Sequence, residues 1–62
     1  MTDDSIRSMD PIIILSIINT KLRDKYASLD SLCDDLEITK ENVLNKLKTI
    51  DYNYIEIENQ FK

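Results

Sequence analysis

The sequence predicts a mostly α-helical fold: a three-helix bundle of helix-turn-helix type, followed by a short C-terminal β-hairpin in a miniature winged-helix layout. Three observations support this prediction. Apolar residues recur at helical spacing within residues 10–26, 28–36 and 39–50. A tight turn with an apolar residue in it, Ile38, separates the second and third of these segments. From residue 51 onward, β-favouring residues dominate.

The first predicted helix begins at Asp10-Pro11 and runs to about Tyr26. Asp is a favourable N-cap, and Pro is tolerated at the first helical position because its missing N–H has no intrahelical partner there. At about 100° per residue, one apolar stripe forms the buried face: Ile14, Leu15, Ile18, Leu22 and Tyr26. Ile13 and Ile17 fall well to the side of that stripe, so they form a second apolar patch.

Two shorter helices follow, with Ser28 and Thr39 as their N-caps. The second helix directs one apolar stripe toward the core: Leu29, Leu32, Cys33 and Leu36. The third helix does the same with Val43, Leu47 and Ile50, with Leu44 on its flank. Helices often end in a left-handed residue, usually Gly. Because the chain contains no Gly, we expect Glu37 and Asp51 to take that conformation.

The tail is predicted to form a β-hairpin with strands at about residues 52–56 and 60–62. Tyr52 and Tyr54 alternate with Asn53, as in a half-buried strand. Glu58-Asn59 is the best turn candidate, because Asn adopts positive φ more readily than most residues.

One domain is expected over residues 9–62, preceded by a disordered extension at residues 1–8, which are polar and lack periodicity. Met9 offers a second start of translation. A chain of 62 residues has room for only a small core, and dimerisation commonly compensates for this.

The composition favours a cytoplasmic protein. A single Cys forms no intrachain disulfide, and the acidic N-terminus does not resemble a signal peptide. The apolar run from Pro11 to Ile18 is much shorter than the roughly 20 residues that span a bilayer. The net charge of −4 argues against a general affinity for nucleic acid or for an anionic membrane, so we expect no membrane partner.

The sequence indicates no enzyme: we expect no catalytic residues, no metal, no cofactor and no small-molecule substrate. The chain has no His and no Gly, which excludes a His base, the usual zinc sites and a Gly-rich phosphate loop. Asp30 and Asp34 share a helix face, but this spacing is more typical of a solvated acidic surface. Cys33 lies on a core stripe, where we expect a packed and inert thiol.

Several strings carry a family resemblance: Asp10 to Asp24, Ser28 to Leu36, Tyr52-Asn-Tyr54 and Asn59-Gln-Phe61. The strings from Asn19 to Asp24 and from Asn59 to Phe61 are the most specific. Over residues 9–62 the chain resembles a small bacterial family catalogued as domain of unknown function 4250. Family members often have Gly where this chain has Asp51, which affects only the local turn. The family has no assigned activity, so the resemblance implies no functional residues.

The hypothesis we favour is a non-enzymatic module that binds another protein or forms a homodimer. Its predicted self-association residues are Ile13 and Ile17, because a three-helix unit leaves them uncovered. The competing explanation is that the hairpin folds over this patch, with Ile55, Ile57 or Phe61 contacting it within one chain.

The alternative hypothesis is a helix-turn-helix transcription regulator that binds DNA. In that fold the second helix of the pair enters the major groove. Here that helix would offer Lys40, Asn42, Asn45, Lys46 and Thr49. Asn can bond adenine, and Lys can contact guanine or phosphate. The preceding helix opposes this hypothesis, because it carries a cluster of acidic residues: Asp30, Asp34, Asp35 and Glu37.

Overall fold

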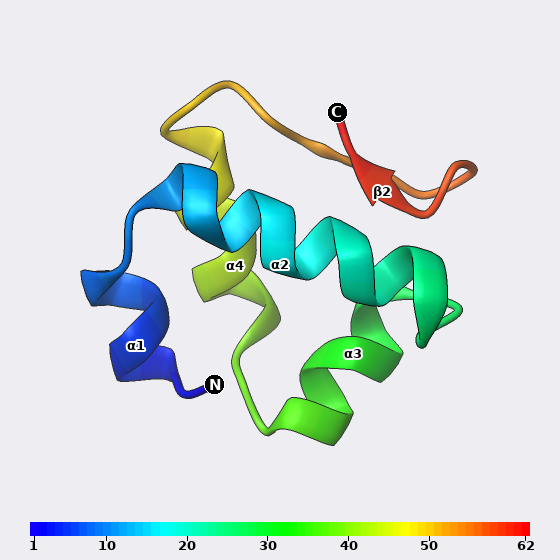
Figure 1. The fold of residues 1–62 in the computed structure, drawn as a ribbon, viewed down its shortest axis with the longest axis horizontal. Helices are drawn as coiled ribbons and strands as arrows, with labels where there is room; N and C mark the ends of the chain where they lie inside the picture. The colour runs from blue at the N-terminus through cyan, green and yellow to red at the C-terminus, as the bar shows by residue number, and fades with distance from the viewer.

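A computed structural model describes the whole chain, residues 1–62. Its elements, in chain order, are α1 (Asp3–Ser8), α2 (Pro11–Asp24), α3 (Leu29–Leu36), α4 (Lys40–Lys48), β1 (Tyr54–Ile55) and β2 (Gln60–Phe61). The predicted mostly helical fold with a C-terminal antiparallel hairpin is confirmed. The longest helix, α2, crosses the middle of the molecule and contacts α3, α4 and β2 (Figure 1).

Helix α2 begins as predicted and ends slightly earlier. The Asp10 side chain accepts a hydrogen bond from the Ile12 N–H, and Pro11 occupies the first helical position. The last helical residue is Asp24 rather than Tyr26, because the N–H groups of Lys25 and Tyr26 both bond the carbonyl of Lys21 and close the final turn.

A left-handed residue follows each of the two short helices of the bundle, directly after α3 and three residues after α4. Glu37 follows α3 with φ 56°, and Asp51 follows α4 with φ 62°, as predicted for a chain without Gly. After α3, the Ile38 N–H reaches back to the Cys33 carbonyl, which places the buried Ile38 side chain under the turn. This three-residue connection brings α4 back onto the core.

The C-terminal hairpin is shorter than predicted. Each strand has only two residues, with Tyr54 opposite Phe61 and Ile55 opposite Gln60. The Asn53 and Lys62 backbones bond each other and extend the pairing by one position. The turn contains Asn59 with φ 53°, the positive φ expected at this position. The Tyr54 and Phe61 rings pack with centroids 5.5 Å apart, so the hairpin presents an aromatic pair to the helices.

The core is wholly apolar. Its eleven buried residues come from every helix, from the turn before α4 and from β2, and none of them is polar or charged. They are Ile6, Ile14, Ile18, Leu22, Leu29, Leu32, Cys33, Ile38, Val43, Leu47 and Phe61. No helix combines the length and the apolar character needed to cross a bilayer.

The N-terminal residues differ from the prediction of a disordered extension. Asp3–Ser8 form α1, which lies against α4 at the edge of the bundle (Figure 1). Thr2 caps this helix by accepting from the Ser5 N–H, and Asp3 and Asp4 occupy its first turn, where negative charge is favourable. A single apolar residue, Ile6, is fully buried. One apolar residue produces no periodicity, which is why the sequence pattern did not predict this helix.

Candidate interaction surfaces

The face of α4 predicted to bind DNA is partly covered by α1. Asn42, Asn45, Lys46 and Thr49 lie along one groove together with Ile6 and Arg7. The Lys46 ammonium donates to the backbone carbonyl of Arg7 at 2.8 Å, and the Thr49 hydroxyl donates to the Lys46 carbonyl at 2.6 Å. Asn45 is exposed and Asn42 is half-buried. Four of the five predicted residues therefore share one surface, and α1 already occupies part of it.

The fifth predicted residue, Lys40, lies away from this groove. Its ammonium pairs with the Asp30 carboxylate of α3 at 3.0 Å. The carboxylate also raises the pKa of Lys40 above its ordinary value through a hydrogen bond and by charge attraction. Both groups are substantially exposed, so water screens the pair and its net contribution to stability is small. A phosphate contact by Lys40 would compete with Asp30.

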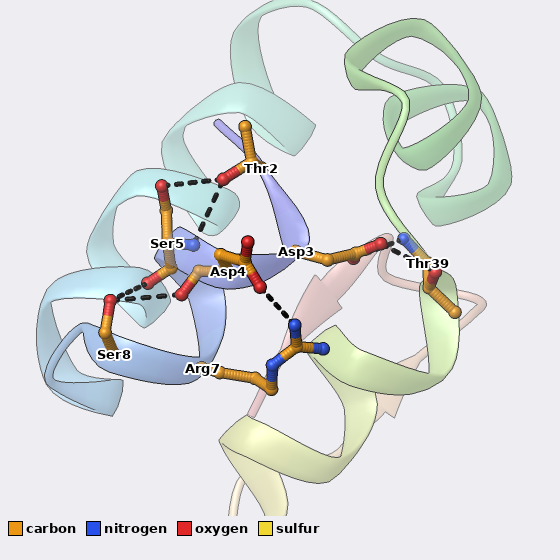
Figure 2. A network of polar contacts seen from close by, with 7 residues as sticks. All are labelled: Thr2, Asp3, Asp4, Ser5, Arg7, Ser8 and Thr39. Atoms are coloured by element: carbon orange, nitrogen blue, oxygen red, sulfur yellow. Dashed lines mark hydrogen bonds and ion pairs between the residues drawn. The ribbon is translucent and has the colours of Figure 1, made fainter.

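Asp3 of α1 binds the start of α4 (Figure 2). Its carboxylate accepts from the backbone N–H of Thr39 at 2.8 Å and from the Thr39 hydroxyl at 2.9 Å. The Thr39 side chain makes no cap within its own helix. These contacts, led by the Thr39 N–H and followed by the Asn42 side chain, hold the pKa of Asp3 below its ordinary value. Asp3, which is far from α4 in the sequence, therefore places a negative charge at the N-terminus of α4, where negative charge is stabilising.

The outward side of α2 carries the exposed apolar residues expected there. Ile13 is 53% exposed and Ile12, one residue earlier, is 65% exposed. Ile17 is half-buried, so of the two predicted self-association residues Ile13 is the more accessible. The sequence pattern places Ile12 in the apolar run but does not predict that it lies on the surface, although Ile12 is more exposed than Ile13. The exposure of both residues creates a small apolar patch in the first turn of α2.

The hairpin does not cover this patch. Phe61 is buried and β2 contacts α2, but Ile57 at the hairpin turn is 94% exposed. A shallow groove runs beside the patch, between α2 and the hairpin turn; its lining includes Ile12, Leu15, Ser16, Thr20, Glu58 and Gln60. The patch therefore continues into a mixed surface made by two elements.

Two Asn side chains attach the hairpin to α2, a role that the sequence pattern does not predict. The Asn19 side chain accepts from the Phe61 N–H at 2.8 Å and donates to the Phe61 carbonyl at 3.0 Å, so it pairs with β2 as a neighbouring strand would. The Asn59 amide donates to the carbonyls of Leu22 and Tyr26 at the end of α2. These bonds connect residues far apart in the sequence, and one sequence offers no local signal for them.

Tyr54 completes this set of contacts, which we call the hairpin clasp (Asn19, Tyr54, Asn59 and Phe61). The Tyr54 hydroxyl donates to the Asn59 side-chain oxygen at 2.6 Å and accepts from the Leu29 N–H at 3.2 Å. The clasp therefore joins α2, the start of α3 and both strands. Its four members all lie in the strings that carry the family resemblance, so those strings have a structural role here.

The groups capable of covalent chemistry are few and dispersed. Cys33 is buried as predicted, at 5% exposure, and burial together with the nearby Asp30 charge raises the pKa of its thiol. No group of three or more Cys, Asp and Glu side chains is arranged to hold a metal ion. The Tyr26 hydroxyl donates to the Asp35 carboxylate at 2.5 Å, which raises the pKa of Tyr26. That contact lies on the surface and connects the end of α2 to α3.

Comparison with curated proteins and comparison with solved structures each found no match. A family model does match, over residues 8–61, which include the clasp, the α2 patch and all of α4. Most of the chain is covered, and the resemblance seen in the sequence is confirmed. The chain therefore belongs to the family described as a domain of unknown function (DUF4250).

Proposed function

We propose that this protein is a small, non-enzymatic interaction module that self-associates through the outward side of α2. The observation that carries the proposal is the adjacent exposure of Ile12 and Ile13 in a chain that buries most of its other large aliphatic residues. In a symmetric pair of α2 helices each of these residues is used twice. Ile17, at the edge of the same side, would meet Ile13 of the second copy if the helices cross near their first turns.

The isoleucines alone are too few to hold a dimer. Burying their exposed parts contributes about 1 kcal/mol for each side chain, or roughly 4 kcal/mol for both copies. Association of two molecules costs at least about 4 kcal/mol in lost freedom. The proposed interface therefore extends into the groove beside the hairpin turn, where Ser16 and Thr20 are small enough for close helix approach. A dissociation constant of tens of micromolar corresponds to about −6 kcal/mol, which the contact in this groove must supply.

Sedimentation equilibrium tests this proposal, over a range of about 10 to 500 micromolar. The expected result is a rise from one chain mass toward two. Replacing Ile12 and Ile13 by Asp should keep the protein monomeric throughout. Ser31→Asp with Asn45→Asp is the matched control, because it adds the same charge at exposed residues of α3 and α4 that lie outside the proposed interface. A parent protein that remains monomeric, or a control that dissociates equally, would contradict the proposal.

The second candidate function is that of a DNA-binding regulator, and the connection between α3 and α4 favours it. Two short helices joined by three residues, with a hairpin following, match the order of elements in a winged helix-turn-helix protein. Asn45 and Lys48 are exposed on α4 and remain free to approach a duplex. For Asn42 and Lys46 to contact DNA, α1 must move away, because the Lys46 ammonium donates to the Arg7 carbonyl.

A mobility-shift titration at low and moderate salt tests DNA binding with pooled genomic duplexes. If α4 is a recognition helix, Asn45→Ala with Lys48→Glu should abolish a salt-sensitive shift. Lys25→Glu carries the same charge change on an exposed residue just after α2 and should reduce binding only slightly. Absence of a shift by the parent protein at low salt would exclude this candidate.

We infer a cytoplasmic location for either function. The support is the single buried Cys33, which suits a reducing compartment. The compartment is tested by fractionating cells that express the protein, where recovery with the membrane or secreted fraction would contradict the inference.

A further inference from the structure

Two exposed apolar features lie at opposite ends of α2. Ile12 and Ile13 occupy its first turn and are 65% and 53% exposed. Ile57, in the hairpin turn, is 94% exposed and is the most exposed large hydrophobic residue of the chain. The Asn59 amide bonds two carbonyls at the end of α2, which holds the hairpin turn at the C-terminal end of this helix (Figure 1). At about 1.5 Å per residue, roughly 16 Å of helix separates the two features within one chain.

A stable dimer needs more surface than the first turn of α2 offers. The chain exposes 4088 Å² in total, and a specific interface buries about 800 Å² on each partner, which is about a fifth of this surface. The groove on α2 extends from Ile12 to Arg23, beside the hairpin turn. An interface of sufficient size therefore uses the outward side of the whole helix and reaches both ends of it.

The middle of this outward side carries small residues. Ile12, Ser16 and Thr20 follow one another at four-residue spacing, all three are exposed, and all three line the groove. The distance between two packed helices depends on the side chains at their contact. Two copies of α2 therefore approach each other most closely if they cross at Ser16 and Thr20.

An antiparallel crossing at this point brings the two apolar features together. A two-fold axis through the crossing places the first turn of each α2 beside the last turn of the other. The hairpin turn of one copy then lies beside Ile12 and Ile13 of the second copy, and the same contact forms twice. A crossing near the first turns would instead leave Ile57 in solvent.

We propose that α2 pairs with α2 of a second copy in antiparallel orientation, and that Ile57 of each copy packs on Ile12 and Ile13 of the other. The proposal rests on the self-association proposed above, and it names the element that completes the interface. It also accounts for the exposed Ile57, which has no apolar partner within its own chain. The groove between α2 and the hairpin turn becomes the centre of the dimer.

Disulfide trapping tests which residues meet. Ile12→Cys and Ile57→Cys are prepared as separate variants of the full chain and are oxidised alone and as a mixture. The mixture should form a covalent dimer roughly tenfold faster than either variant alone, because only residues 12 and 57 of different copies are adjacent. The parent chain is the control, since its one thiol, Cys33, is buried and should form no covalent dimer.

Sedimentation equilibrium supplies a second measurement that needs no added thiol. Ile57→Asp should raise the dissociation constant roughly tenfold or more, because each dimer loses two buried Ile side chains. Ile57→Thr should weaken the dimer without adding charge. Ser31→Asp is the matched control, because it adds one charge at an exposed residue of α3, and it should leave the dissociation constant unchanged. All three variants should keep the parent melting temperature, since both positions are exposed.

The results separate failure of this arrangement from failure of self-association. Rapid trapping of Ile12→Cys alone would show that the helices cross near their first turns, and it would overturn the proposal while self-association stands. An Ile57→Asp variant that dimerises as tightly as the parent would overturn it in the same way. A parent chain that stays monomeric throughout the concentration range would overturn both.

Discussion

Removing the Asn19 side chain should detach the hairpin from α2. Asn19 makes two hydrogen bonds to the Phe61 backbone, at 2.8 Å and 3.0 Å. Each is worth about 1 kcal/mol net, and leaving partly buried partners unsatisfied costs about 1–3 kcal/mol. We therefore expect Asn19→Ala to lower the free energy of unfolding by about 2–3 kcal/mol. A domain of 62 residues has a total stability of roughly 3–9 kcal/mol, so this loss is a large fraction of it.

Urea denaturation followed by circular dichroism measures this loss. With a slope of about 1 kcal/mol/M for so small a domain, the midpoint should fall by about 2 M or more. Asn45→Ala is the matched control, since Asn45 is exposed on α4 and Ala is a better helix former, and its effect should stay within about 0.5 kcal/mol. The Phe61 amide should also exchange much faster in Asn19→Ala than in the control. A decrease in the free energy of unfolding below about 0.5 kcal/mol would refute the reasoning. It would mean that water replaces the two Asn19 hydrogen bonds without a loss of stability.

Three further predictions concern single residues. Cys33 should react slowly with a thiol reagent in native buffer and quickly in denaturant, because burial both restricts access and raises its pKa; rapid native labelling would contradict its place in the core. Glu37→Gly should raise the free energy of unfolding by up to about 1 kcal/mol, since Glu37 has φ 56°; a lower melting temperature would show that the Glu37 side chain stabilises the turn. Protonation of Asp3 should weaken the contact between α1 and Thr39: the folded-state pKa of Asp3 is lowered, so its contribution is present above about pH 4 and is lost as pH falls through the folded-state pKa. Thr39 and Asn42 of the bundle and Arg7 of α1 face Asp3, and Asp3→Asn should abolish the acid-induced shift of the Thr39 amide.

The features that the sequence predicted well are those that depend on neighbouring residues. Asp10-Pro11 begins α2 because capping and φ restriction act within one turn. Glu37 and Asp51 take left-handed conformations because a helix that turns back needs such a residue and no Gly is available. The burial of Cys33 follows from its position on an apolar stripe. Each of these properties is set by residues within about one helical turn.

The features that sequence reasoning missed depend on distant contacts. Helix α1 forms because Ile6 and Asp3 find partners on α4, and its own six residues contain only one apolar side chain. In the sequence, Asn19 is an ordinary polar residue of α2. Its structural role depends on its hydrogen bond with Phe61, which is 42 residues away. The predicted strands were too long because alternation of Tyr and Asn indicated extended chain, whereas backbone pairing ends after two residues in each strand.

The residues that mark the family are largely committed to holding the fold together. Asn19 bonds the Phe61 backbone, and Asn59 bonds Tyr54 and the carbonyls of Leu22 and Tyr26, so the side chains of these two Asn residues are not free to bind a ligand. If the protein is the interaction module proposed above, its contacts must then depend on residues outside these strings or at their edges. Two surfaces meet that condition: the patch at Ile12 and Ile13, and the groove between α1 and α4. They lie on different helices and depend on different contacts, so a variant at one surface should leave the other unchanged.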